Sequence, residues 1–165
     1  MALTSGQLAA IKADIIANSD LNTKPNNSDG NDAIAKIYNL AASPAWTVWK
    51  VNVAINDVGK SLNGTELAGM TTGNQTRLQT IALYLANGVD PSLASNRAFF
   101  DDVFSGAGGT NTRAALLILW KRLATRLEKL LSTGTGSDAA PATLPTVGFT
   151  EGTITYSEIE QARNS

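Results

Sequence analysis

The side chains that most often perform enzyme chemistry are partly missing from this chain. It has no histidine and no cysteine, which excludes imidazole general bases, Ser-His-Asp triads, thiol nucleophiles and the usual zinc ligands. Catalysis would have to rest on Asp, Glu, Lys, Arg, Tyr, Ser or Thr alone. We therefore expect no enzyme, no catalytic residue, no cofactor and no metal ion.

Two segments approach known phosphate-binding patterns. Residues 54–61, AINDVGKS, differ from the GxxxxGKS loop at the first position, where Ala54 replaces the glycine that lets backbone amides wrap a phosphate. Residues 106–109, GAGG, precede a predicted helix whose N-terminus is a potential anion site, but they lack the GxGxxG spacing. We interpret the first segment as the end of a helix and the second as a hinge between helices.

Two groups of charged residues are candidates for a site, and only the second indicates one. Asp101 and Asp102 are adjacent, so on a helix their side chains point about 100° apart and do not form a facing pair of carboxylates. Cations, by contrast, gather in residues 111–131, with a net charge of +4 from Arg113, Lys121, Arg122, Arg126 and Lys129 against Glu128. This exceeds what a helix dipole needs. We predict an electrostatic partner surface there; the alternative is a solvated helix face.

The spacing of apolar residues predicts a mainly α fold, an irregular bundle of about five or six helices. The longest predicted helix, residues 111–131, carries a coiled-coil-like seam with alternating spacings of four and three, formed by Leu116, Trp120, Leu123, Leu127 and Leu130. We expect this seam to be the core of the body. Residues 46–53, WTVWKVNV, favour a strand by composition, although a buried helical turn fits the same pattern.

The composition changes after Leu131 and predicts an extended C-terminal arm. Residues 1–131 form the predicted helical body and residues 132–165 the flexible arm. Its first part, residues 132–148, is almost all small, polar, Gly or Pro, and we expect it to be mobile in the free protein. A short strand or helix tip then brings apolar side chains that we expect to dock on a partner: Phe149, Ile154, Tyr156 and Ile159. The alternative is a tail that folds back onto its own domain. If the tip docks elsewhere, deletion of residues 132–165 leaves a folded body.

Several segments resemble a family of small virion proteins of tailed bacteriophages. The similar segments are MTTGNQTRLQ (70–79), RAFFDDVFSG (97–106), and KRLATR (121–126) with TGTGSD (133–138). The opening LTSGQL (3–8), the aromatic SPAWTVW (43–49), and the closing Phe149, Glu151-Gly152 and Ala162-Arg163 are similar as well. The likeness covers nearly the whole chain, and the architecture is similar to that of the head–tail adaptors that form rings beneath the portal.

The resemblance implies a structural, non-enzymatic role as a head–tail connector. The implied partners are further copies in a ring, the portal protein and a tail nozzle or tube protein, with DNA passing through without sequence-specific binding. The implied location is the neck of the virion, with assembly in the host cytoplasm and no membrane contact. Alternatives are another tail or head-completion protein, or a nucleic-acid-binding accessory factor, which the net charge of −1 disfavours.

Overall fold

The computed structural model describes residues 3–84, 87–145 and 153–165. These residues are mainly helical, which confirms the predicted mainly α class. The chain forms two compact units, unit 1 (Met1–Val48 and Leu123–Ser165) and unit 2 (Trp49–Arg122). This division differs from the predicted body and arm, because residues from both ends of the chain share one unit. The two-stranded sheet of β1 (Thr47–Trp49) and β2 (Lys121–Leu123) contains both points where the chain passes from one unit to the other.

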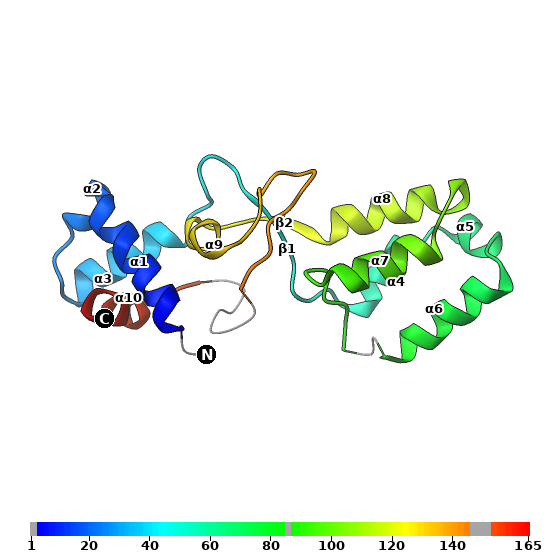
Figure 1. Ribbon diagram of the computed structural model, residues 1–165, viewed down its shortest axis with the longest axis horizontal. Helices are drawn as coiled ribbons and strands as arrows, with labels where there is room; N and C mark the ends of the chain where they lie inside the picture. The colour runs from blue at the N-terminus through cyan, green and yellow to red at the C-terminus, as the bar shows by residue number, and fades with distance from the viewer. Residues whose placement is uncertain (1–2, 85–86, 146–152) are drawn as a thin grey trace. The chain divides into compact units, whose positions relative to one another are not determined.

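The helices, labelled in Figure 1, divide between the two units. Unit 1 contains α1 (Ser5–Ala17), α2 (Ser19–Asn22), α3 (Ser28–Tyr38), α9 (Arg126–Leu131) and α10 (Tyr156–Asn164). Unit 2 contains α4 (Ile55–Ser61), α5 (Gly64–Ala68), α6 (Thr72–Tyr84), α7 (Ala94–Val103), the 3₁₀ turn η1 (Ala107–Gly109) and α8 (Thr110–Leu119).

The last helix closes the core of unit 1. α10, red in Figure 1, packs against α3 and α1, in blue, and its Ile159 and Ala162 have no exposed surface. The core draws side chains from both ends of the chain: Ile11, Ile15, Leu21, Ile34, Ala35, Tyr38, Leu127, Ile154, Ile159 and Ala162. The docking role expected for Ile154 and Ile159 is therefore wrong, because side chains buried in this core have no surface left for a partner.

Polar contacts hold the C-terminal segment in register. The side-chain amide of Asn39 pairs with the backbone of Ile154 in both directions, accepting from its N–H at 2.8 Å and donating to its carbonyl at 3.0 Å. The Arg163 guanidinium donates to the carbonyls of Lys24 and Pro25 and to Oδ1 of Asn31, at 2.9 to 3.0 Å. These bonds satisfy backbone groups that would otherwise be left unpaired at the ends of helices.

The segment after α9 is organised around a tryptophan ring instead of its own side chains. The Trp46 indole donates from Nε1 to the Ser132 hydroxyl at 2.9 Å, and Gly136 (φ +62°) lies so close to the ring that a Cβ there would overlap it. Residues Thr133 and Thr143 bridge in antiparallel fashion. Ala142 and Leu144 are buried, so the described part of residues 132–148 is not a free linker.

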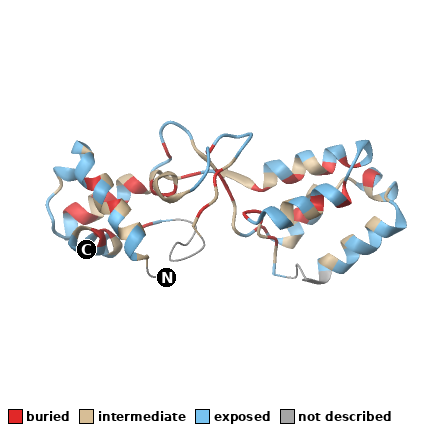
Figure 2. Ribbon diagram, viewed as in Figure 1, coloured by how far each residue is buried: buried red, intermediate tan, exposed pale blue. Residues whose placement is uncertain are grey.

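Unit 2 has its own core, formed where α4, α7 and α8 meet. Buried aromatic and aliphatic side chains fill it: Trp49, Val53, Val58, Val89, Phe100, Val103, Phe104, Leu116 and Trp120. The Phe100 and Trp120 rings meet edge to face with centroids 5.3 Å apart. α6 contacts α7 but is exposed along most of its length (Figure 2).

The predicted long helix over residues 111–131 is wrong. A continuous helix needs a bond from the Ala124 amide to the Trp120 carbonyl, but Ala124 donates to the Trp46 carbonyl at 2.8 Å, and the Trp120 carbonyl accepts from the Lys50 amide at 2.9 Å. α9 then starts anew with a capping box between Thr125 and Glu128.

This break divides the predicted seam. Leu116 and Trp120 belong to the core of unit 2, Leu127 belongs to that of unit 1, and Leu123 is 64% exposed. The seam is therefore not one surface, and Leu123 contributes no core side chain.

Truncation of two leucines tests this division. Leu116→Ala is expected to lower the free energy of unfolding by about 2–5 kcal/mol, because it leaves a cavity at a side chain that is 1% exposed. Leu123→Ala is expected to change it by no more than about 0.5 kcal/mol. Urea unfolding followed by tryptophan fluorescence measures the free energy of unfolding of both variants. Equal decreases would show that both leucines belong to one continuous seam.

Truncation within α10 tests how unit 1 closes. Ile159→Ala is expected to cost about 2–5 kcal/mol, whereas Ile16→Ala, at a side chain that is 62% exposed on α1, serves as a matched control with little effect. Deletion of residues 153–165 is expected to remove the cooperative unfolding of unit 1, because it uncovers Ile11 and Ile34. A truncated chain with unchanged helical circular dichroism and melting temperature would contradict this closure.

Candidate functional site

The five predicted cations do not share one helix. Arg113 lies on α8 and donates to the Gly106 carbonyl at 2.9 Å, and Lys121 and Arg122 lie in β2. Arg126 and Lys129 lie on α9, in the other unit. The predicted continuous basic helix face therefore does not exist, because the helix that would carry it is interrupted after Leu119.

The predicted tip residues also separate. Ile154 and Ile159 are core residues of unit 1, and Tyr156 is 53% exposed on the same segment. Phe149 lies outside the described residues. Of the described tip residues, Tyr156 alone keeps a surface that a partner can reach.

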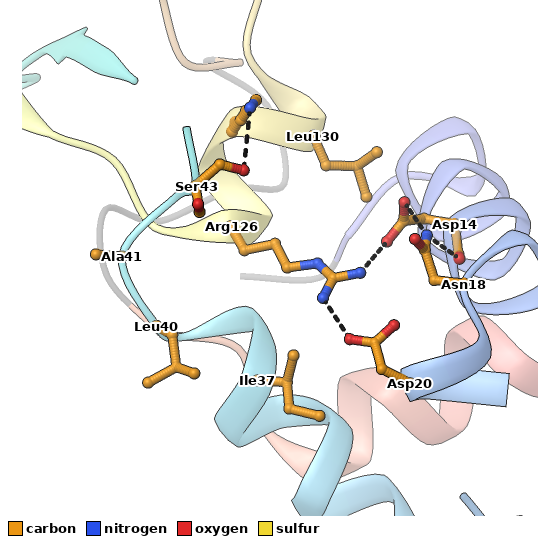
Figure 3. Close-up of a pocket in the computed structure, with 10 residues that line it drawn as sticks. Asp14, Asn18, Asp20, Ile37, Leu40, Ala41, Ser43, Arg126 and Leu130 are labelled. Carbon is orange, nitrogen blue, oxygen red and sulfur yellow. Dashed lines mark hydrogen bonds and ion pairs between the residues drawn. The ribbon is translucent and has the colours of Figure 1, made fainter. Parts of the chain in front are cut away.

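An open pocket of about 860 Å³ lies around Arg126 in unit 1 (Figure 3). It is lined by polar and apolar side chains in similar number: Asp14, Asn18, Asp20, Ile37, Leu40, Ala41, Ser43, Arg126, Lys129 and Leu130. Figure 3 shows the guanidinium of Arg126 reaching between the carboxylates of Asp14 and Asp20. Its nitrogens lie 2.8 Å from Asp20 Oδ2 and 3.6 Å from Asp14 Oδ2.

Arg126 is held by its own protein and not presented to a ligand. Its guanidinium also lies over the Tyr38 ring, 5.6 Å from the centroid, and the hydrogen bond from Arg126 lowers the pKa of the Asp20 carboxyl. The two carboxylates neutralise the cation, so the pocket has little attraction for a phosphate or carboxylate. Lys129, on the same wall, lies 5.4 Å from the Trp46 ring centroid.

Tyr38 connects this network to the core. It is fully buried, and its hydroxyl donates to Asp14 Oδ2 at 2.8 Å. Burial, followed by the hydrogen bond to Asp14, raises the pKa of the Tyr38 phenol well above its ordinary value. A phenol that keeps its proton and already donates it to a carboxylate is a structural donor and not a general base.

The helix N-terminus after the GAGG segment is already occupied by a carboxylate. Glu66 on α5 accepts from the backbone amides of Asn111 and Thr112, each at 2.8 Å. Burial of Glu66 opposes its ionisation, but these bonds outweigh that cost and lower the pKa of its carboxyl. An external anion has no access to these donors. Residues Ala107–Gly109 form the turn η1, which leads directly into α8.

The near-phosphate-loop segment is also used structurally. Residues Ile55–Ser61 form α4, so the backbone does not wrap into an anion cradle. Lys60 bonds to Asp57 at 2.9 Å, one turn earlier on the same helix. Asp102 forms an ion pair with Arg77 and does not form a carboxylate dyad with Asp101.

Sequence patterns missed the acidic residues that organise both units. Asp20 and Arg126 are 106 positions apart, and Glu66 and Asn111 are 45 positions apart, so no local spacing connects them. One short-range signal was present, the T-x-x-E capping box of Thr125 and Glu128 inside the predicted long helix.

An exposed apolar face is the clearest candidate for contact with another molecule. On α8, Leu117 is 39% exposed and Ile118 is 74% exposed. Ala114, one turn earlier, is exposed as well, so the three side chains are neighbours on one face of the helix. Contiguous exposed apolar surface of this kind marks interaction sites more often than isolated side chains do.

Comparison of the chain with protein-family models, curated proteins and solved structures finds no match. Within the ranges that the structure describes, no helix is long and apolar enough to span a bilayer. The same ranges contain no cluster of three or more acidic side chains able to hold a metal ion.

The Tyr38 hydrogen bond makes stability depend on pH in the alkaline range. The folded phenol holds its proton while the unfolded one ionises near pH 10, so the free energy of unfolding is expected to fall as the pH rises above about 10, by up to about 1.4 kcal/mol per pH unit. Tyr38→Phe removes this component and flattens the fall. Urea unfolding between pH 8 and about 11.5 measures it.

Two features separate this effect from a general loss of stability. Ile159→Ala, which removes a buried side chain of unit 1 that does not ionise, is expected to lower the free energy of unfolding and to keep the wild-type slope. Near neutral pH, Tyr38→Phe is expected to cost about 1 kcal/mol for the lost bond to Asp14. Identical alkaline slopes for Tyr38→Phe and the wild type would show that the phenol ionises freely in the folded chain.

Proposed function

We propose that this chain is a structural protein of a tailed-phage particle, a head–tail connector that assembles with further copies of itself between the portal and the tail. The proposal joins the resemblance to small phage virion proteins with one structural observation, the exposed apolar face of α8. A protein with this function needs rigid surfaces and partners, and it needs no catalytic group.

The α8 face supports assembly because its exposure is not needed for the fold. The other side of the same helix, with Thr112, Leu116 and Trp120, already fills the core of unit 2. Leu117 and Ile118 therefore expose apolar surface to water, and this surface does not stabilise the isolated chain. Such surface becomes favourable when another protein covers it.

The two units supply the rigidity that the proposal requires. Each has its own apolar core. Three acidic side chains add internal contacts: Asp14 and Asp20 form ion pairs with Arg126, and Glu66 accepts a hydrogen bond at the N-terminus of α8. In this proposal the C-terminal segment closes unit 1, and Tyr156 is its accessible contact. Portal protein, a tail nozzle or tube protein, and neighbouring copies are the proposed partners, with DNA passing through the ring.

Analysis of particles of the phage that encodes this chain tests the proposal. The protein is expected in mature virions in multiple copies by quantitative mass spectrometry, and an epitope label on it is expected at the neck in negative-stain images. A phage lacking the gene is expected to produce DNA-filled heads without attached tails. Absence from mature particles would contradict any virion role, and a label along the tail would favour the alternative of a tail component.

A DNA-binding assay separates the remaining alternative. The isolated protein is expected to show no salt-sensitive shift of duplex DNA, because Arg113 and Arg126 are engaged within the molecule. Binding that weakens steeply with salt would instead favour a nucleic-acid-binding accessory factor.

A further inference from the structure

We infer that the apolar face of α8 docks into a pocket between α6 and α7 of a neighbouring copy, in a head-to-tail contact that repeats around a ring. The inference rests on the proposed assembly of copies and names the two surfaces that meet. Both surfaces belong to unit 2, so the contact can be argued within one compact unit.

The pocket is small, open and almost wholly apolar. It has a volume of about 340 Å³ and is lined by Thr76, Arg77, Thr80, Ile81 and Phe99. Phe99 lines it and packs against the core of unit 2, where its ring meets the Phe100 ring edge to face with centroids 5.4 Å apart. A pair of aliphatic side chains such as Leu117 and Ile118 matches this chemistry, because the one charged side chain in the lining, Arg77, is already paired with Asp102.

The two surfaces lie on different edges of unit 2. In Figure 1, α7 separates α6 from α8 within this unit, and the contacts of the two helices agree: α8 packs on α4, and α6 packs on α7. A protrusion and a pocket on different edges cannot satisfy each other within one chain. Between copies they make a heterologous contact, which leaves a free protrusion and a free pocket at the two ends until a ring closes.

The charges disfavour pairing of α8 with a second α8. α8 carries Arg113 and no acidic residue. On the pocket side, two arginines balance two carboxylates: Arg77 pairs with Asp102, and Arg97 lies one turn before Asp101 on α7. A second α8 would bring two arginines together, whereas α8 against this neutral side would not.

The limited area explains how such a contact can be confined to the assembled particle. With 39% and 74% exposed, Leu117 and Ile118 together offer roughly one residue's worth of surface. A stable pairwise interface buries ~800 Å² on each partner. A single contact is therefore expected to be weak, and repetition around a closed ring, or on a portal template, supplies the missing affinity.

Cysteine cross-linking tests the contact directly, because the chain has no cysteine of its own. Ala114→Cys places a thiol beside the protrusion without altering Leu117 or Ile118, and Thr80→Cys places one on the pocket rim. The double variant, treated with a short bismaleimide in concentrated solution and in purified particles, is expected to give a ladder of covalent oligomers. The control pairs Ala114→Cys with Ser95→Cys, an exposed position on α7 outside the pocket, and is expected to give no ladder.

Added charge then shows whether the apolar side chains drive the contact. Ile118→Glu in the reactive double variant is expected to reduce cross-linking at least tenfold, whereas Leu93→Glu, at a side chain that is 46% exposed elsewhere in unit 2, leaves it unchanged. Covalent dimers from Ala114→Cys alone would show that α8 pairs with itself and overturn the inference. So would an equal ladder from the control pair, or no ladder under either condition.

The experiment also separates this inference from the proposed function. If the protein is present in virions and the reactive pair does not cross-link there, the contact is wrong while the connector role stands. If the protein is absent from virions, the connector role is wrong, and the ladder in solution alone decides whether copies meet through α8 and the pocket.

Discussion

Unit 1 depends on the burial of α10 between helices from the start of the chain. Ile159 and Ala162 have no exposed surface, and they cover Ile11, Ile34 and other side chains that would otherwise face water. The stabilising free energy comes from the transfer of these apolar groups out of water. Hydrogen bonds between the backbone and the side chains of Asn39 and Arg163 fix the position of the C-terminal segment. The C-terminal residues are therefore part of the fold, and the first helices have a complete core only when the last one is in place.

A single interruption determines how the rest of the chain is distributed. The Trp120 carbonyl bonds to Lys50 and the Ala124 amide bonds to Trp46, so the backbone leaves the helix for the strand β2. Trp120 and Leu116 remain with unit 2, and Leu127 enters unit 1. The apolar core is therefore divided between the two units, where a continuous helix would have organised one core. The same interruption assigns the predicted basic residues to different elements.

The ionisable side chains are used mainly inside the molecule. Asp14 and Asp20 neutralise Arg126, Tyr38 donates to Asp14, and Glu66 satisfies the first amides of α8. Each arrangement removes a group from possible chemistry and stabilises a helix end or a packing contact. The surface left for partners is apolar, on α8 and between α6 and α7, and this distribution fits a protein whose proposed role is assembly.

Composition and local pattern were sufficient for the helical class and for the absence of imidazole and thiol chemistry, because both depend on residue types and short spacings. The strand favoured over residues 46–53 follows from the same kind of local pattern, and β1 occupies Thr47–Trp49. Residues 132–145 show where local pattern is insufficient. They have few apolar side chains of their own and were predicted to be mobile, yet the Trp46 ring and a bridge between Thr133 and Thr143 order them.

The partners of distant residues could be decided only by tertiary structure. The sequence does not show whether Ile159 packs against Ile11 or against a neighbouring molecule, because the hydrophobic effect is non-directional and selects no particular partner. The pairing of Arg126 with Asp20 likewise depends on two helices brought together by the core and not on any spacing along the chain. The fold class of this protein thus follows from local sequence patterns. Contacts between residues far apart in the chain decide the division into two units and determine which apolar side chains are buried.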